Sequence, residues 1–158
     1  ILDRLKLKKI IIVSSAPQIR YPDCYGIDMA KLGDFIAFRA AISLLQKTEK
    51  GRQAIQGVYQ KCKNAIKEPK EKQHNHLLEI YHGFTEQEIS QEIANLLKTD
   101  HLLTDFSVVF QSAENLHLAC PKHKGDWYFT GNYPTPGGNM VANKAFIYYI
   151  EGANKRAY

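Results

Sequence analysis

Histidine and carboxylate side chains gather in one polar stretch of the sequence. His74, His76 and His82 lie there with Glu79, among lysines and further glutamates. A His-x-His pair can bind zinc, but a structural zinc site takes a complete tetrahedral set of ligands. No cysteine lies nearby in the sequence to complete such a set. The composition therefore favours a solvated polar segment over a metal site.

A thiol and two imidazoles come close together nearer the C-terminus. Cys120 lies between His117 and His123. A nucleophilic cysteine needs a general base that a third group orients in space, and closeness in sequence supplies no such orientation. We expect no catalytic residue here, and none elsewhere in the chain.

A predicted strand that runs into an irregular loop is the most informative element. Lys9–Val13 is a short, continuous, β-branched run, which is typical of a strand covered on both faces. Pro17 and Pro22 then exclude regular structure, and Gly26 allows a turn. The loop extends through Asp28, whose carboxylate is suited to cap the next helix.

Apolar periodicity predicts helices through most of the remaining chain. Thr85 and Glu88 have the spacing of a capping box, which marks a helix start. The predicted helices cover Met29 to about Leu45, Glu49–Lys67, Asn75–Tyr81, 85–98, a turn or two after Ser112, and Asn143–Glu151 after a loop at Pro136–Asn139; Ser107–Gln111 is a predicted strand. The expected fold is α/β and mostly helical, with a few short strands.

Length and composition describe one globular domain. The chain has 158 residues, 44% of them hydrophobic, and a net charge of +5, which supports an ordinary core and excludes a disordered chain. No apolar run is long enough to span a membrane, and no secretory signal is visible. The cysteines Cys24, Cys62 and Cys120 are expected to be reduced thiols of a cytoplasmic protein.

Separate segments of the chain resemble one enzyme family. Ser14–Pro17 with Tyr25–Asp28, and Phe129–Thr135 near the C-terminus, resemble in order the end of the type I phosphoribosyltransferase domain of amidophosphoribosyltransferases. Glu88–Ile93 and Ser107–Gln111 resemble the helix and the small strand that lie between them in the family. The resemblance is to the long variants of Bacteroidetes-like bacteria, and it covers the chain in pieces.

The resemblance implies a division of the chain into three parts. Residues 1–38 would be the C-terminal end of the phosphoribosyltransferase-like domain, 39–83 a helical insertion, and 84–158 a helix-strand-helix extension. The family's glutaminase domain and its acidic-pair phosphate loop have no counterpart in this sequence. We therefore expect a fragment whose missing N-terminal glutaminase and phosphoribosyltransferase domains lie upstream of Ile1.

The implied activity belongs to the parent protein. Amidophosphoribosyltransferases of de novo purine synthesis transfer ammonia from glutamine to phosphoribosyl diphosphate with Mg²⁺, giving phosphoribosylamine and diphosphate. The fragment itself is expected to be structural, inactive and without a cofactor. One branch of the family holds an iron–sulfur cluster on a Cys-x-x-Cys motif, but those positions are Gly125 and Tyr128 here, so no cluster is expected.

The same resemblance suggests which residues lie near a substrate. By analogy with other type I phosphoribosyltransferases, Tyr21, Tyr25 or Asp28 would border the acceptor pocket or an inhibitory nucleotide. A structural explanation is also open and is favoured: Tyr25 packs, Gly26 forms a turn, and Asp28 caps a helix.

A non-catalytic interaction or regulatory module is the alternative function. It would bind nucleotide or nucleic acid through the basic face of the 49–67 helix, formed by Lys50, Arg52, Lys61, Lys63 and Lys67. Interrupting glutamates and the lack of a nucleic-acid motif favour a solvated face, so a nucleic-acid partner is not expected.

Aromatic residues mark a second possible contact surface. Trp127–Phe129 and Tyr133 would either bind a partner or fill the seam beside the last strand. In a fragment, part of the apolar surface would have packed on absent domains. We therefore expect an exposed hydrophobic patch and a homo-oligomer, with no membrane partner.

Overall fold

The computed structural model describes residues 5–26, 29–99, 103–122 and 125–157. It is mostly helical with two short parallel strands, so the expected α/β class is confirmed at this level. In chain order the elements are β1 (Lys9–Ser14), η2 (Leu32–Asp34), α1 (Ile36–Gln46), α2 (Glu49–Ala65), η3 (Lys70–Lys72), η4 (His76–Ile80), α3 (Glu86–Leu97), β2 (Asp105–Phe110), α4 (Ala113–Ala119), α5 (Trp127–Thr130) and α6 (Pro136–Ile150).

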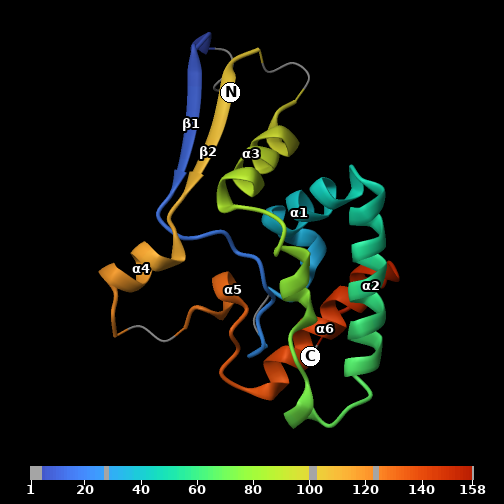
Figure 1. Cartoon of the computed structure of the whole chain (residues 1–158). Coiled ribbons are helices and arrows are strands. Elements are labelled where there is room, and N and C mark those ends of the chain that lie inside the picture. Colours follow the sequence, from blue (N-terminus) through green and yellow to red (C-terminus); the bar gives the residue numbers. More distant parts are fainter. Residues whose placement is uncertain (1–4, 27–28, 100–102, 123–124, 158) are drawn as a thin grey trace.

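The two strands lie side by side at one end of the molecule (Figure 1). They are parallel, with Lys9 opposite Asp105 and Ser14 opposite Phe110. Helix α3 packs on β2 and connects the sheet to the helical part of the molecule, where α1 and α2 pack together and α6 packs on α2.

The prediction of a first strand covered on both faces is wrong. Ile10 is buried, but Ile11 and Val13 are 52% and 71% exposed. Within the described residues the sheet has only these two strands, and the packed helix α3 contacts it through β2. The β-branched run therefore forms the expected strand without the expected cover.

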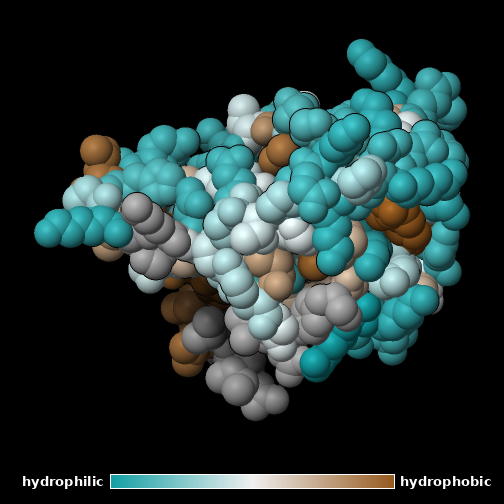
Figure 2. Space-filling view, turned by 90° about the horizontal axis from the view of Figure 1, so that it is seen from below, coloured by the Kyte–Doolittle hydropathy of each residue, from teal (hydrophilic) through white to brown (hydrophobic). Residues whose placement is uncertain are grey.

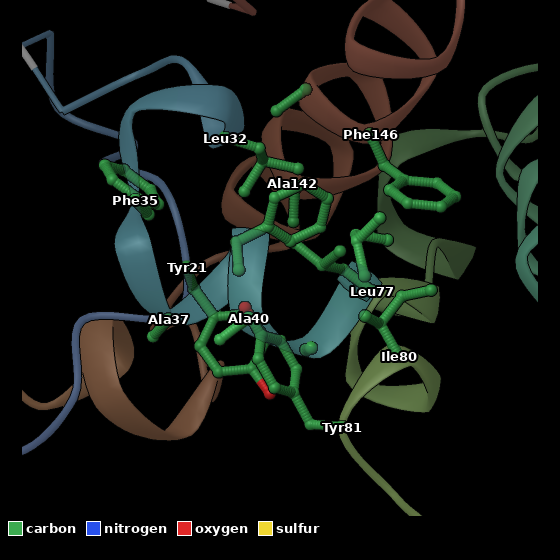
Figure 3. Packing of buried hydrophobic residues seen from close by; sticks show 14 of the residues in the cluster. Tyr21, Leu32, Phe35, Ala37, Ala40, Leu77, Ile80, Tyr81, Ala142 and Phe146 are labelled. Atoms are coloured by element: carbon green, nitrogen blue, oxygen red, sulfur yellow. The ribbon is translucent and has the colours of Figure 1, made fainter. Parts of the chain in front are cut away.

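One hydrophobic core holds the helical part together. Phe38 of α1 and Phe146 of α6 are fully buried, with ring centroids 6.1 Å apart in an edge-to-face arrangement. Figure 3 shows residues of the first, second and third expected parts in this one cluster, including Tyr21, Leu77 and Phe146. The three parts therefore share their core.

Local signals set two helix starts as expected. The Thr85 hydroxyl accepts a hydrogen bond from the N–H of Glu88, and the Glu88 carboxylate accepts one from the N–H of Thr85, so the capping box is confirmed. Thr48 caps α2 by accepting from the N–H of Gly51 at 3.0 Å.

Two other predicted starts are wrong. The first long helix begins at Ile36 and not near Met29, because Phe35 has an extended backbone after the short η2 turn. Asp28, the predicted cap, lies outside the described residues. The last helix begins at Pro136 and not at Asn143, since proline is tolerated in a first helical turn. Gly138 is needed there because a Cβ would lie 2.4 Å from the Tyr133 ring.

The surface is mainly polar. Figure 2 shows hydrophilic side chains over most of one face, with hydrophobic residues in small clusters. Among the described helices, none is long and apolar enough to cross a membrane.

Candidate functional site

The loop after β1 and the segment before α6 lie against each other; we call this contact, residues 20–25 with 128–133, the joint. The N–H groups of Arg20 and Tyr21 donate to the carbonyl of Tyr128 at 2.8 and 3.1 Å. The Tyr133 hydroxyl donates to the carbonyl of Pro22, 111 positions away, at 2.7 Å. The two distant segments are thus held together by direct hydrogen bonds.

A buried carboxylate lies at the centre of the joint. Asp23 is 0% exposed. Its Oδ1 accepts from the Tyr128 hydroxyl and its Oδ2 from the N–H of Tyr25, each at 2.8 Å. Burial and the hydrogen bond to Asp23 raise the pKa of Tyr128 to about 12, so this phenol stays protonated and donates at neutral pH. Sequence reasoning missed Asp23, because its partner is remote in sequence.

Tyrosine rings and a glycine close the other side of the joint. The rings of Tyr21 and Tyr81 lie 5.3 Å apart, and the Tyr81 hydroxyl donates to the carbonyl of Arg20 at 2.8 Å. Figure 3 shows the two side chains next to each other. Gly131 has a φ of +74°, and a Cβ there would lie 2.9 Å from the Tyr21 ring. The Asn75 amide donates to the Gly131 carbonyl at 3.0 Å. Only glycine fits this position without strain.

A pocket of about 470 Å³ opens beside the joint, where the carboxyl ends of both strands meet. Ligands of parallel α/β folds bind at this edge of the sheet. The lining is mainly apolar: Ser14, Ala16, Pro17, Ile19, Met29, Asp34, Phe35, Ile36, Ala37 and Phe110. The Ser14 hydroxyl already donates to the Ala16 carbonyl, at 3.0 Å. The pocket suits an apolar or aromatic group.

Of the residues predicted to border a substrate, the two that the structure describes, Tyr21 and Tyr25, do not line this pocket. Tyr21 is 3% exposed and belongs to the core, whereas Tyr25 is 63% exposed and its ring lies 5.4 Å from that of Trp127. Asp28 lies outside the described residues. The lining residues, Ile19 and Phe110 among them, were missed. The rule that ligands bind at the carboxyl ends of parallel strands would have pointed to them, had the pairing of the two strands been predicted.

Glu79 in the histidine-rich stretch contacts a histidine and a lysine. Its two oxygens contact His76 Nδ1 at 3.2 Å and Lys61 Nζ at 2.6 Å. Burial raises the pKa of Glu79, but these two hydrogen bonds outweigh it, so the carboxylate titrates below its usual range. Within the described ranges, no group of three or more histidines, cysteines and carboxylates could hold a metal ion.

Cys120 and His117, near the C-terminus, line a second pocket of about 360 Å³. His117 Nε2 lies 3.0 Å from a carboxylate oxygen of Asp126, which orients the imidazole. Cys120 lines the same pocket and is exposed, while His123 lies outside the described residues. Asp126 is thus the group that orients this histidine, and the sequence alone did not indicate it.

Glutamates occupy much of the basic face of α2. The ion pairs are Lys61–Glu79, Lys63–Glu151 and Arg52–Glu49, at 2.6, 3.3 and 2.7 Å. Such exposed pairs add little stability, but they reduce the net positive charge that this helix presents.

Comparison of the chain with protein-family models, with curated proteins and with solved structures finds no match.

Proposed function

We propose that this chain is the C-terminal portion of an amidophosphoribosyltransferase-like protein of purine synthesis. In the intact protein, ammonia released by hydrolysis of glutamine attacks phosphoribosyl diphosphate. A C–N bond forms, the C–O bond to diphosphate breaks, and the products are phosphoribosylamine, glutamate and diphosphate. The proposal assigns this chemistry and its Mg²⁺ to residues outside the chain, and a structural role to the chain itself.

The joint is the observation that supports this proposal most strongly. The segments that resemble the family, Tyr25–Asp28 with its preceding loop and Phe129–Thr135, were recognised separately in the sequence. In the fold, the Tyr133 hydroxyl reaches the Pro22 carbonyl at 2.7 Å, and Gly131 packs against the Tyr21 ring. Motifs that form one structural unit in a family are expected to meet in space, whereas chance matches have no physical reason to do so.

The pocket at the strand ends gives the proposal a site. It lies beside the loop that the resemblance places near the acceptor or an inhibitory nucleotide, and its lining includes Phe35 and Phe110. An apolar, partly aromatic pocket accommodates the flat face of a nucleobase. In this proposal the joint fixes the loop, and the loop borders the pocket.

The test is an assay of the complete protein encoded by the parent gene. Diphosphate release is measured with glutamine and phosphoribosyl diphosphate together, and with each omitted. We expect release that needs both substrates. Release that does not depend on glutamine, or no release from a folded protein, would reject the proposal.

A matched pair of glycine variants tests the role of the joint in the same assay. Gly131→Ala adds a Cβ that would lie 2.9 Å from the Tyr21 ring, whereas a Cβ at Gly57 would meet nothing within 4 Å. We expect Gly131→Ala to lower both diphosphate release and the melting temperature, and Gly57→Ala to lower neither. Equal diphosphate release by both variants would show that the joint does not affect the activity.

A further inference from the structure

A thiol, an imidazole and a carboxylate line the pocket of about 360 Å³ beside α4 and α5. They belong to Cys120, His117 and Asp126, which are the titratable groups among its lining residues. Figure 1 shows that α4 lies away from α1, α2 and α6, which form the helical part of the molecule. The function proposed above uses none of these three side chains.

The end of α4 brings the imidazole and the thiol to the same side. The N–H of Cys120 donates to the carbonyl of Leu116 at 2.8 Å, so Cys120 still closes the last turn of the helix. Residues three positions apart in such a turn are neighbours, with Cβ atoms roughly 5–6 Å apart. His117 and Cys120 have this spacing, and both line the pocket.

Asp126 determines which nitrogen of His117 is available. A carboxylate oxygen of Asp126 lies 3.0 Å from His117 Nε2. An ionised carboxylate only accepts hydrogen bonds, so a neutral imidazole beside it carries its proton on Nε2. The lone pair is then on Nδ1, which is the nitrogen that can take a proton from a thiol. The thiolate, and not the thiol, is the nucleophile in cysteine chemistry.

The two other cysteines of the chain have surroundings that favour the neutral thiol. Cys62 is 0% exposed, and burial raises its pKa to about 12. Cys24 is partly buried, and burial together with the neighbouring Asp23 carboxylate raises the pKa of its thiol. Cys120, in contrast, is exposed, so a reagent in solution reaches it directly.

We infer that Cys120 is a site of thiol–disulfide exchange with a small disulfide from solution, and that His117 is the base. The Sγ–H proton passes to His117 Nδ1, and the Cys120 sulfur attacks one sulfur of the disulfide. A new S–S bond forms, the original S–S bond breaks, and the leaving thiolate takes the proton from His117 and departs as a thiol. The Cys120 sulfur is oxidised and the leaving sulfur is reduced, so no further reactant is needed.

The size and lining of the pocket fit a disulfide of low molecular weight. Pockets for small molecules have volumes of about 300–1,000 Å³, and this pocket, of about 360 Å³, lies at the lower end. Trp127 and Pro134 supply an apolar wall, and Asn132 supplies an amide that can hydrogen-bond a polar group of the bound molecule. The inference does not rest on the proposed enzymatic activity.

Oxidised glutathione is the probe that tests the inference, and the complete protein that contains this chain is the sample. Peptide mass spectrometry measures the rate at which Cys120 gains glutathione, separately from every other cysteine. His117→Gln removes the base, whereas His82→Gln makes the same change at an exposed histidine elsewhere. Circular dichroism verifies that each variant is folded.

At pH 7 we expect His117→Gln to slow the reaction of Cys120 about tenfold, because little of a free thiol is ionised at this pH. His82→Gln should leave the rate unchanged. At about pH 10 a free thiol ionises without a base, so His117→Gln should then react as fast as the unmodified protein.

Two results at pH 7 would overturn the inference. One is a Cys120 that gains no glutathione, and the other is an equal rate with and without His117. Slower reaction of His117→Gln that persists at pH 10 would also overturn it, since His117 would then control access to the thiol and not its ionisation.

Discussion

Side chains at the centre of the joint are buried, whereas those on the first strand of the two-stranded sheet are largely exposed. In the joint, Asp23 is 0% exposed and both of its carboxylate oxygens accept hydrogen bonds at 2.8 Å. In the sheet, Ile11 and Val13 lie largely in water. The centre of the joint is thus buried and hydrogen-bonded, whereas strand β1 keeps much of its apolar surface exposed among the described residues. The predictions below use this contrast.

A matched isoleucine pair gives the largest expected difference. Ile89 of α3 is 0% exposed, whereas Ile11 of β1 is 52% exposed. We expect Ile89→Ala to lower the free energy of unfolding by about 2–5 kcal/mol, because it leaves a cavity in the core. Ile11→Ala should cost less than about 1 kcal/mol. Urea denaturation of both variants at low protein concentration measures the two values. Similar losses of unfolding free energy would contradict the difference in burial between the core and strand β1.

The next largest effect is expected at the glycine of the joint. Gly131→Ala forces a side chain into a backbone with φ of +74° and against the Tyr21 ring, which should cost about 2–3 kcal/mol. Gly57→Ala in α2, where nothing lies within 4 Å of the new Cβ, should stabilise by about 0.5–1 kcal/mol. Thermal unfolding followed by circular dichroism compares them. An unchanged melting temperature of Gly131→Ala would mean that the joint is not tightly packed around this residue.

Removal of one hydroxyl tests the buried carboxylate. Tyr128→Phe deletes the hydrogen bond to Asp23 Oδ1, and we expect a loss of about 1–2 kcal/mol in the free energy of unfolding. Tyr25 is 63% exposed, so Tyr25→Phe is the control and should change stability by less than about 0.5 kcal/mol. Equal losses of unfolding free energy for Tyr128→Phe and Tyr25→Phe in chemical denaturation would show that the hydrogen bond to Asp23 does not stabilise the joint.

The smallest expected effect depends on pH. Glu92 of α3 accepts from Lys47 Nζ at 2.7 Å and from the Ser43 hydroxyl at 2.6 Å. Burial raises the pKa of Glu92, but hydrogen bonds from these residues outweigh it and hold the pKa below its usual value. Glu92→Gln should therefore cost about 1 kcal/mol at pH 7.

The sign of the pH dependence follows from the lowered pKa. The ionised Glu92 stabilises the fold above its unfolded pKa of about 4.3, and the contribution is lost as the pH falls through the lower folded pKa. The difference in unfolding free energy between the unmodified chain and Glu92→Gln should thus narrow below about pH 4. A difference that stays constant from pH 7 to pH 3 would contradict this assignment.

Local signals in the sequence predicted what depends on near neighbours. The capping box of Thr85 and Glu88 is confirmed, as is the start of α2 at Glu49, because each needs contacts of only a few residues' separation. The start of α6 was predicted wrongly, because Pro136 and the glycines after it indicate a loop, whereas proline is also tolerated in the first turn of a helix.

The candidate site depended on contacts of long range, and most of it could not be predicted. The loop after β1 was singled out from its prolines and its family resemblance. The Asp23–Tyr128 hydrogen bond and the pocket between Ser14 and Phe110 were not, since each joins segments about a hundred positions apart. Hydrophobic periodicity indicates which residues are apolar, but it does not indicate which strands are neighbours.

The sequence by itself determined that this chain is a mostly helical α/β protein, where several of its helices begin, and that a β-branched strand leads into a proline-rich loop. Those features follow from backbone preferences and short-range hydrogen bonds. Only the tertiary structure decided that Lys9–Ser14 pairs with Asp105–Phe110 and that the loop after this strand closes on residues 128–133. The physical reason is that burial and strand pairing depend on which residues are neighbours in space, and the sequence does not show which distant residues become neighbours.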